Sequence, residues 1–309
     1  MGRPYPVAAS AALELVLVGP ARPATVVATT PHATYLETAD HDRTIFCLAS
    51  SAAVRVPCAL VLESKALPPQ VPPGTTAELG GGLVNIHSSG SSSGFRIQRW
   101  WRPPRPRGLG TAPPSRLAAA VRWLTGRVAD PLDPSGRSAV AELVAAMAAG
   151  ESPDAPVSRL LGRGPGLTPT GDDVLAGALV TLHALGSPTA AALAQAVRTQ
   201  APEATTTVSA ALLRHAADGR CIPQLADLLT AVGGATPQTP GAAPTDQTAE
   251  ALPRAAGALL AVGNCSGAGL LHGVLVAVAI AHERLAHGVI ESRPAMPPIP
   301  AALPSPVAA

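Results

Sequence analysis

The part of this chain best suited to chemistry is a glycine- and hydroxyl-rich stretch that ends in two adjacent carboxylates. It spans residues 162–173 and reads Gly-Arg-Gly-Pro-Gly-Leu-Thr-Pro-Thr-Gly-Asp-Asp. The apolar helix pattern of residues 174–179 follows directly, which places the stretch at a helix N-terminus, where backbone N–H groups lack partners within the helix. Because such groups attract anions, this junction predicts a site for a small polar or anionic ligand.

The same junction occurs a second time near the C-terminus. Residues 170–179 align without gaps to residues 266–275 as Thr/Ser-Gly-x-x-Val/Leu-Leu-x-Gly-x-Leu. Each copy begins with a hydroxyl side chain that can cap a helix, and each carries an interior glycine, Gly177 or Gly273. An interior helical glycine costs about 1 kcal/mol relative to alanine, so the pair indicates close helix contact. We expect the two helices to cross near these glycines and their N-termini to meet at one pocket.

The polar side chains of the junctions have competing explanations. Thr170 and Asp173 fit the spacing of a capping box, in which the acid only completes the helix start. Asp172 is not needed for that motif, so its carboxylate is a candidate for ligand contact, although an acid in a first helical turn is ordinary. Cys265 precedes a helix start, where a thiol can become reactive, or it is a small buried residue. Arg163 can pair with a carboxylate or phosphate.

Common catalytic and metal-binding signatures do not occur in the sequence. It has no Gly-x-Ser-x-Gly elbow, no Walker loop and no dinucleotide fingerprint. The eight histidines have no metal-ligand spacing, and we select His272 as the first histidine to test because it lies beside the second junction. The four cysteines form no Cys-x-x-Cys pair, so neither disulfides nor a zinc site is expected. The adjacent aspartates are weak evidence for Mg²⁺, and we therefore expect no cofactor.

The amino-acid composition restricts the kinds of molecule that this chain can bind. The net charge is only +2, without a long basic run, and aromatic residues make up 2% of the chain, which argues against nucleic-acid binding. The longest apolar run, residues 274–281, is shorter than the ~20 residues that span a bilayer. Residues 13–18 are too short and too alternating for the apolar core of a secretory signal. These features favour a soluble cytoplasmic protein without a membrane partner.

The pattern of elements predicts an α+β protein. Short β-branched or apolar segments at 13–18, 24–30, 44–48, 54–62 and 83–87 favour a small β-barrel or sandwich, with a glycine–serine loop at 88–94. Helical patterns dominate afterwards, and glycines such as Gly150 and Gly186 follow their last turns. The predicted domains are a β-rich domain at 1–100, a proline-rich connection at 101–114, a helical domain with the paired motifs at 115–290 and a disordered tail at 291–309. Residues 234–247 read as a mobile loop.

Three segments of the chain resemble the AllH-like family, whose named member is a subunit of oxamate carbamoyltransferase in anaerobic allantoin degradation. They are residues 164–177, 206–213 and 263–273. The third departs from the family's usual pattern, because Cys265 stands where serine is usual and Gly269 where aspartate is frequent. The resemblance implies carbamoyl transfer between oxalurate and phosphate, giving oxamate and carbamoyl phosphate. It also implies that other transferase subunits are partners.

The resemblance, joined to the chemistry of the residues, gives each a predicted role. Backbone N–H groups of the glycines would bind an anion, hydroxyls would orient the ligand, and Asp172 would accept from a carbamoyl or ureido NH₂ group. The predicted catalytic residues are Asp172, Asp173 and Thr170. The predicted substrate-binding residues are Arg163, Gly164, Gly166, Thr168, Gly171, Asn264, Cys265, Ser266, Gly267 and His272. The alternative is a non-catalytic scaffold or a metabolite-binding regulatory subunit.

Overall fold

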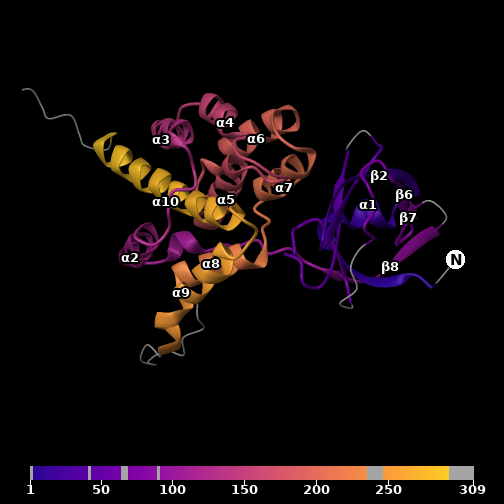
Figure 1. Ribbon diagram of the computed structural model, residues 1–309. Helices are drawn as coiled ribbons and strands as arrows, with labels where there is room; N and C mark the ends of the chain where they lie inside the picture. Colours follow the sequence, from indigo (N-terminus) through magenta and orange to yellow (C-terminus); the bar gives the residue numbers. More distant parts are fainter. Residues whose placement is uncertain (1–2, 41–42, 64–68, 89–90, 235–245, 292–309) are drawn as a thin grey trace, which may run out of the picture.

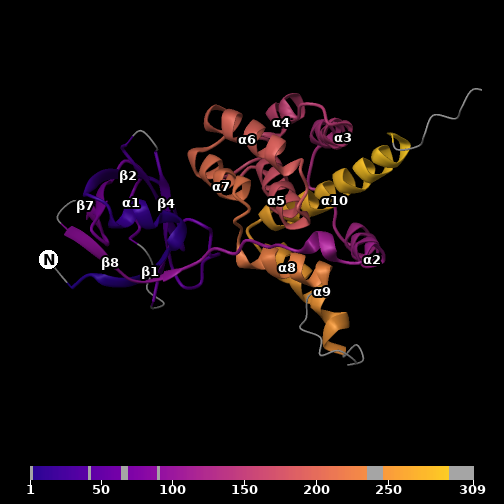
Figure 2. The ribbon, with the colours of Figure 1, turned by 180° about the vertical axis from the view of Figure 1, so that it is seen from behind.

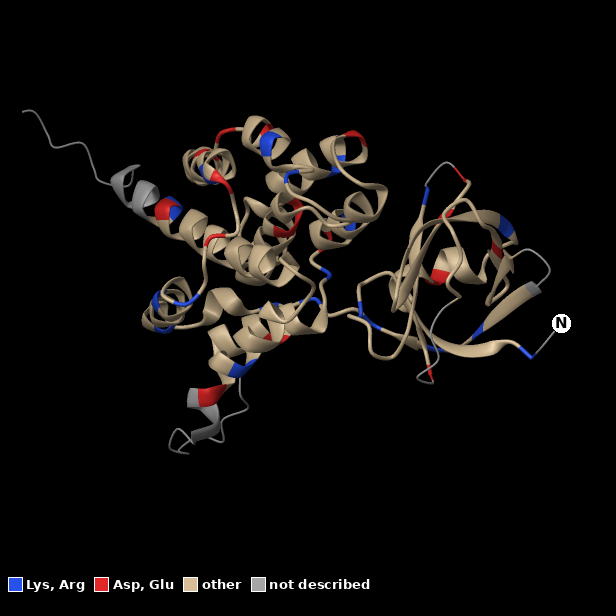
Figure 3. Cartoon of the chain, in the orientation of Figure 1, with Lys and Arg blue, Asp and Glu red and all other residues tan. Residues whose placement is uncertain are grey.

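The computed structural model describes residues 3–40, 43–63, 69–88, 91–234 and 246–291 (Figure 1). A β-rich part and a helical part lie side by side, and Figure 2 shows the same arrangement from the opposite side. The chain passes from one part to the other through residues 102–108, which form neither helix nor strand. Positively and negatively charged residues are interspersed along the chain in both parts (Figure 3).

The N-terminal part is a closed barrel, which is more specific than the predicted barrel or sandwich. Its strands follow one another around the barrel in the order β1-β5-β4-β3-β2-β6-β7-β8, and parallel pairing of β1 with β8 closes it. Closure pairs every strand on both sides and so removes exposed edges. The strands are β1 (Tyr5–Ser10), β2 (Arg22–Thr30), β3 (Ala33–Thr38), β4 (Ile45–Ala49), β5 (Ala59–Leu62), β6 (Thr76–Gly80), β7 (Leu83–Ser88) and β8 (Ser91–Trp101).

Two predictions about the barrel were wrong, and a third was too long, since only residues 59–62 of the predicted strand 54–62 form β5. Residues 13–18, predicted as a strand, lie in a short 3₁₀ turn and helix α1 (Glu14–Val18). Ser10 caps this turn, and Leu13 and Leu17, four residues apart, are buried on one side, which is helical spacing. The predicted loop at 88–94 is largely strand β8, because pairing with β7 and β1 holds glycine- and serine-rich backbone that has little strand propensity of its own.

After the barrel, the regular elements of the described residues are all helical, as predicted. Gly150 and Gly186 end their helices in the left-handed conformation, with φ of +76° and +67°. The predicted loop at 234–247 falls mostly, and the predicted tail almost wholly, outside the described residues. The helices are α2 (Pro114–Thr125), α3 (Pro134–Ala149), α4 (Asp154–Leu160), α5 (Thr170–Leu185), α6 (Ala190–Ala204), α7 (Thr207–Ala217), α8 (Pro223–Gly233), α9 (Asp246–Leu260) and α10 (Ser266–Glu291).

Helices α5 and α10 cross at their glycines, which confirms the prediction from the repeated motif. A Cβ atom at Gly177 would collide with the carbonyl oxygen of Leu270, and one at Gly273 would collide with that of Val174. Both obstacles are backbone atoms, which cannot rotate away as a side chain can. By length and composition, residues Ser266–Leu285 of α10 could cross a membrane, but here they pack along α5 and α3.

Candidate functional site

The two glycine motifs meet where α5 and α10 begin. The hydroxyl oxygens of Thr168 and Ser266 lie 2.9 Å apart, and Thr170 donates a hydrogen bond to the sulfur of Cys265 at 3.5 Å. These pairs join residues almost a hundred positions apart in the sequence. The helix crossing therefore brings the hydroxyl groups of both motifs to one place.

A cavity of about 190 Å³ opens beside this meeting point, between the helices and the barrel. Thr168, Asp173 and Ser266 line it from the two motifs. The barrel contributes one wall of the cavity, which the sequence did not reveal. The lining residues from the barrel are Tyr35, Val54, Val56 and Pro57.

Asp173 is the residue whose state is most unusual. Its side chain is only 8% exposed, and its Oδ2 has no hydrogen-bond partner within the described part of the chain. Burial raises the pKa of Asp173 to about 7; a hydrogen bond from the Ser266 hydroxyl to the carboxyl group opposes this shift, and the charge of Asp172 adds to it. A carboxyl group with this pKa is present in both protonation states near neutral pH, so it can either accept or donate a proton.

The capping explanation of Asp173 is wrong. Helix α5 begins at Thr170 itself, its N-cap is Pro169, and no side chain caps it. The backbone N–H of Asp173 donates to the carbonyl oxygen of Pro169 at 3.1 Å. Its carboxyl group is therefore not used by the helix start and remains available to the cavity.

Asp172 is bound entirely within the protein. Its Oδ1 accepts from the backbone N–H of Gly162 at 2.8 Å, and its Oδ2 accepts from the hydroxyls of Ser209, at 2.6 Å, and Thr205. Burial raises the pKa of Asp172, and these three donors oppose that shift. The side chain is not among those lining the cavity. The carboxylate thus ties the glycine loop to the start of α7, and the predicted ligand role for it stays a prediction.

We expect Asp172→Ala to destabilise the protein by about 3 kcal/mol, because it leaves three donors without their buried acceptor. Urea unfolding measures this loss. Asp227→Ala is the control, since Asp227 is an exposed aspartate on α8 whose loss should change stability by less than about 0.5 kcal/mol. Equal stability of the two variants would refute the structural role of Asp172.

The glycine loop uses its glycines for shape. Gly164 and Gly166 adopt φ of +113° and +96°, which side chains rarely allow. A Cβ atom at Gly164 would lie 2.8 Å from the backbone nitrogen of Thr170. The N–H of Gly171 donates to the carbonyl oxygen of Arg163 at 2.8 Å, so this donor is already used inside the loop. Anion binding by the loop glycines stays a prediction.

Gly269 stands where α10 approaches the candidate carboxyl group. A Cβ atom at this position would lie 2.7 Å from the Cβ of Asp173 and 3.2 Å from the carbonyl oxygen of Thr170. Both distances are shorter than ordinary contacts. Helix α10 can therefore come this close to Asp173 only because position 269 has no side chain, and an aspartate there would need a wider gap.

The other predicted site residues lie elsewhere. The Arg163 guanidinium binds Asp133 at 2.8 Å, at the start of α3. Burial lowers the pKa of His272, and the charge of Asp130 opposes this shift. Asn264 is exposed, and Gly267 packs against the end of α9 at Leu259. None of these four lines the cavity.

Two further polar residues line the cavity, and neither was predicted from the sequence. Arg220, just before α8, donates from Nη1 to Asp218. Tyr35, on β3, has its pKa raised by burial and by Cys47 and Cys58, so its phenol stays neutral. Neither lies in a recognisable motif, since only the packing of barrel against helices brings them to Asp173. Within the described residues no group of three or more His, Cys, Asp or Glu is placed to hold a metal ion.

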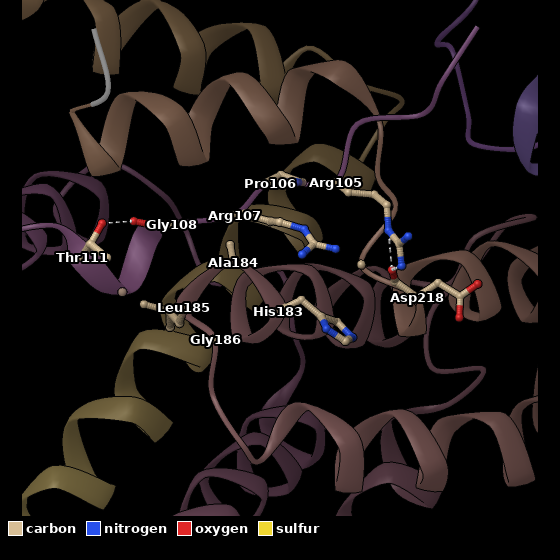
Figure 4. A pocket seen from close by; sticks show the side chains of 12 residues that line it. Arg105, Pro106, Arg107, Gly108, Thr111, His183, Ala184, Leu185, Gly186 and Asp218 are labelled. Carbon is tan, nitrogen blue, oxygen red and sulfur yellow. Dashed lines mark hydrogen bonds between the residues drawn. The ribbon is translucent and has the colours of Figure 1, made fainter. Parts of the chain in front are cut away.

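A second, more open cavity of about 520 Å³ lies at the opposite end of α5 (Figure 4). Arg105 donates to the backbone carbonyl of Asp218, and the guanidinium of Arg107 points toward the ring of His183. No residue predicted from the glycine motifs lines this cavity. Of these two cavities, only the one at Asp173 is lined by residues predicted from the glycine motifs.

Comparison with known proteins agrees with the resemblance noted in the sequence. Residues 160–278 match the model of the family described as oxamate carbamoyltransferase subunit AllH. This segment begins before α5 and includes most of α10, so it holds both glycine motifs, and the barrel lies outside it. Comparison with curated proteins and with solved structures gave no match.

Proposed function

We propose that this chain is a carbamoyltransferase subunit whose substrate site is the cavity at Asp173. The proposal starts from the match of residues 160–278 to the AllH family. The unpartnered, buried Oδ2 of Asp173 is the observation that carries the proposal. A buried acceptor without a donor is costly, so a ligand that supplies one is favoured. The NH₂ group of a carbamoyl or ureido compound supplies such a donor.

The remaining polar groups of the cavity fit the same ligand. The Thr168 and Ser266 hydroxyls, 2.9 Å apart, can each donate to or accept from a carbamoyl group beside Asp173. The Arg220 guanidinium uses Nη1 for Asp218, which leaves N–H donors on Nε and Nη2 for an anionic group of the substrate. A ligand with NH₂ at one end and a carboxylate at the other matches both charged residues of the lining.

The reaction proposed is carbamoyl transfer from oxalurate to phosphate. A phosphate oxygen bonds to the carbamoyl carbon, the bond from that carbon to the oxamate nitrogen breaks, and the proton of hydrogen phosphate ends on that nitrogen. Oxamate and carbamoyl phosphate are the products, so atoms and charge balance. Asp173, with its pKa of about 7, is suited to move this proton between the two partners. Positioning of the reactants supplies much of the remaining rate enhancement.

Partner subunits belong to the proposal, since the family is that of a subunit. We place the complex in the cytoplasm, where α10 acts as a core helix that packs on α5. The alternative, a metabolite-binding regulatory subunit, is favoured by one observation: the adjacent carboxylate, Asp172, is fully engaged within the protein. Ligand binding without any transfer in the assembled complex would identify this alternative.

The proposal predicts thermal stabilisation by ligands that carry a carbamoyl or ureido NH₂. Oxalurate, oxamate and carbamoyl phosphate should each raise the melting temperature, by an amount that corresponds to about 2.7 kcal/mol at a hundredfold excess over Kd. Phosphate alone should act less, because it offers Asp173 no NH₂ group. A differential scanning fluorimetry series with the full chain measures the shifts.

Asp173→Ala should remove these shifts, whereas Asp227→Ala, which alters an exposed aspartate of α8, should keep them. The proposal fails if no carbamoyl compound stabilises the protein. It also fails if Asp173→Ala responds as the unaltered chain does.

A further inference from the structure

The cavity at Asp173 has more apolar wall than a carbamoyl group requires. Most of its lining is aliphatic and comes from both parts of the molecule. Val54 and Pro57 stand on the barrel side, and Val180 and Leu225 stand on the helical side. Its volume is about 190 Å³. An aliphatic wall of this kind favours a ligand that buries apolar surface between its polar ends.

The charges of the lining restrict the rest of the ligand. Of the lining residues that the structure describes, Arg220 is the only cation and Asp173 the only acid. The Arg220 side chain is 25% exposed and already bound to Asp218, and its remaining N–H donors are suited to a carboxylate of the ligand. An apolar body between an NH₂ group and a carboxylate satisfies all of these features.

We propose that the cavity takes an N-carbamoyl α-amino acid with an aliphatic side chain the size of that of valine or leucine. This inference rests on the proposed function, because it assumes the carbamoyl NH₂ at Asp173. The carboxylate then meets Arg220, and the aliphatic side chain packs against Val54 and Val180. Oxalurate shares the two polar ends of this ligand but lacks the aliphatic group.

The test is isothermal titration of the full chain with N-carbamoylglycine, N-carbamoyl-L-valine, oxalurate and isovalerate. Burial of the three extra carbons of valine should tighten binding about 50-fold relative to N-carbamoylglycine, at about 0.8 kcal/mol for each carbon. Equal or weaker binding of N-carbamoyl-L-valine would overturn the inference.

Val54→Phe, which fills part of the cavity from the barrel side, should weaken the binding of N-carbamoyl-L-valine more than that of N-carbamoylglycine and so remove the preference for valine. Val18→Phe is the matched control, because Val18 is an exposed residue at the end of α1 that does not line the cavity. A preference that survives Val54→Phe would also count against the inference.

The ligand set separates the two possible failures. If oxalurate and N-carbamoylglycine bind through Asp173 but the valine compound gains nothing, the function stands and the aliphatic specificity is refuted. If isovalerate, which lacks the carbamoyl group, binds as tightly as N-carbamoyl-L-valine, the proposed function itself is refuted, and the inference falls with it.

Discussion

Replacing Asp173 with asparagine is expected to stabilise the folded chain at about pH 8 while it removes ligand binding. The carboxyl group is buried without a cation, and burial raises its pKa to about 7. Above that pH the folded protein must keep a buried charge, which asparagine does not carry. The same substitution takes away the acceptor on which the proposed ligand contact depends.

The size of this effect follows from proton linkage. A carboxyl group whose pKa is higher in the folded than in the unfolded chain stabilises the fold below the unfolded pKa. That contribution is lost as the pH rises toward the folded pKa of about 7. At about pH 8, the free energy of unfolding of Asp173→Asn should therefore exceed that of the unaltered chain by up to about 4 kcal/mol. This difference should vanish near about pH 4. Urea unfolding at several pH values measures the difference.

Asp227→Asn serves as the control for the pH series, since it alters an exposed aspartate of α8 and should change stability little. An advantage of Asp173→Asn that is independent of pH would mean that the carboxyl group does not titrate as inferred. A loss of stability at high pH would mean that Asp173 has a partner that stabilises its charge.

The second large effect is expected at the helix crossing. Gly177→Ala places a methyl group against the backbone carbonyl of Leu270, and the two helices must separate to admit it. Forced overpacking of this kind costs about 3 kcal/mol, despite the better helix propensity of alanine. Because the cavity lies at the N-termini of the same helices, ligand binding should weaken as well.

Gly257→Ala is a matched control on the same chain. Gly257 lies inside α9, is exposed, and a Cβ atom there meets nothing within 4 Å. The same substitution should therefore stabilise the protein by about 1 kcal/mol through helix propensity. Thermal unfolding of both variants gives the comparison. If Gly177→Ala is as stable as Gly257→Ala, α5 and α10 do not pack as closely as the structure has them.

The paired glycine motifs were predictable because their signal is local. Interior glycines are read from residue types and spacing, and Gly177 and Gly273 cross as the repeated pattern indicated. The predicted cap at Thr170 was wrong, because α5 begins at that residue and no side chain caps it. The helices of the C-terminal part follow from the same short-range rules. Strands were harder to predict, because β3 and β6 depend on partners in the barrel more than on their own propensity.

Asp172 and Asp173 show what the sequence left open. Neighbouring residues of a helix point about 100° apart, so the two carboxylates had to face different surroundings. The sequence could not say which faced the protein and which faced a cavity. The packing of α5 between α7 and α10 directs Asp172 to Ser209 and Thr205 and leaves Oδ2 of Asp173 without a partner.

By itself, the sequence determined the two helix starts, their shared glycines and the resemblance to a family of transferase subunits, because all of these depend on residues close together in the chain. The availability of one carboxyl group, and the cavity that Tyr35, Val54 and Arg220 complete around it, depend on how the folded chain packs. The physical reason is that burial and charge neutralisation depend on contacts between distant segments, and these contacts exist only once barrel and helices have packed together.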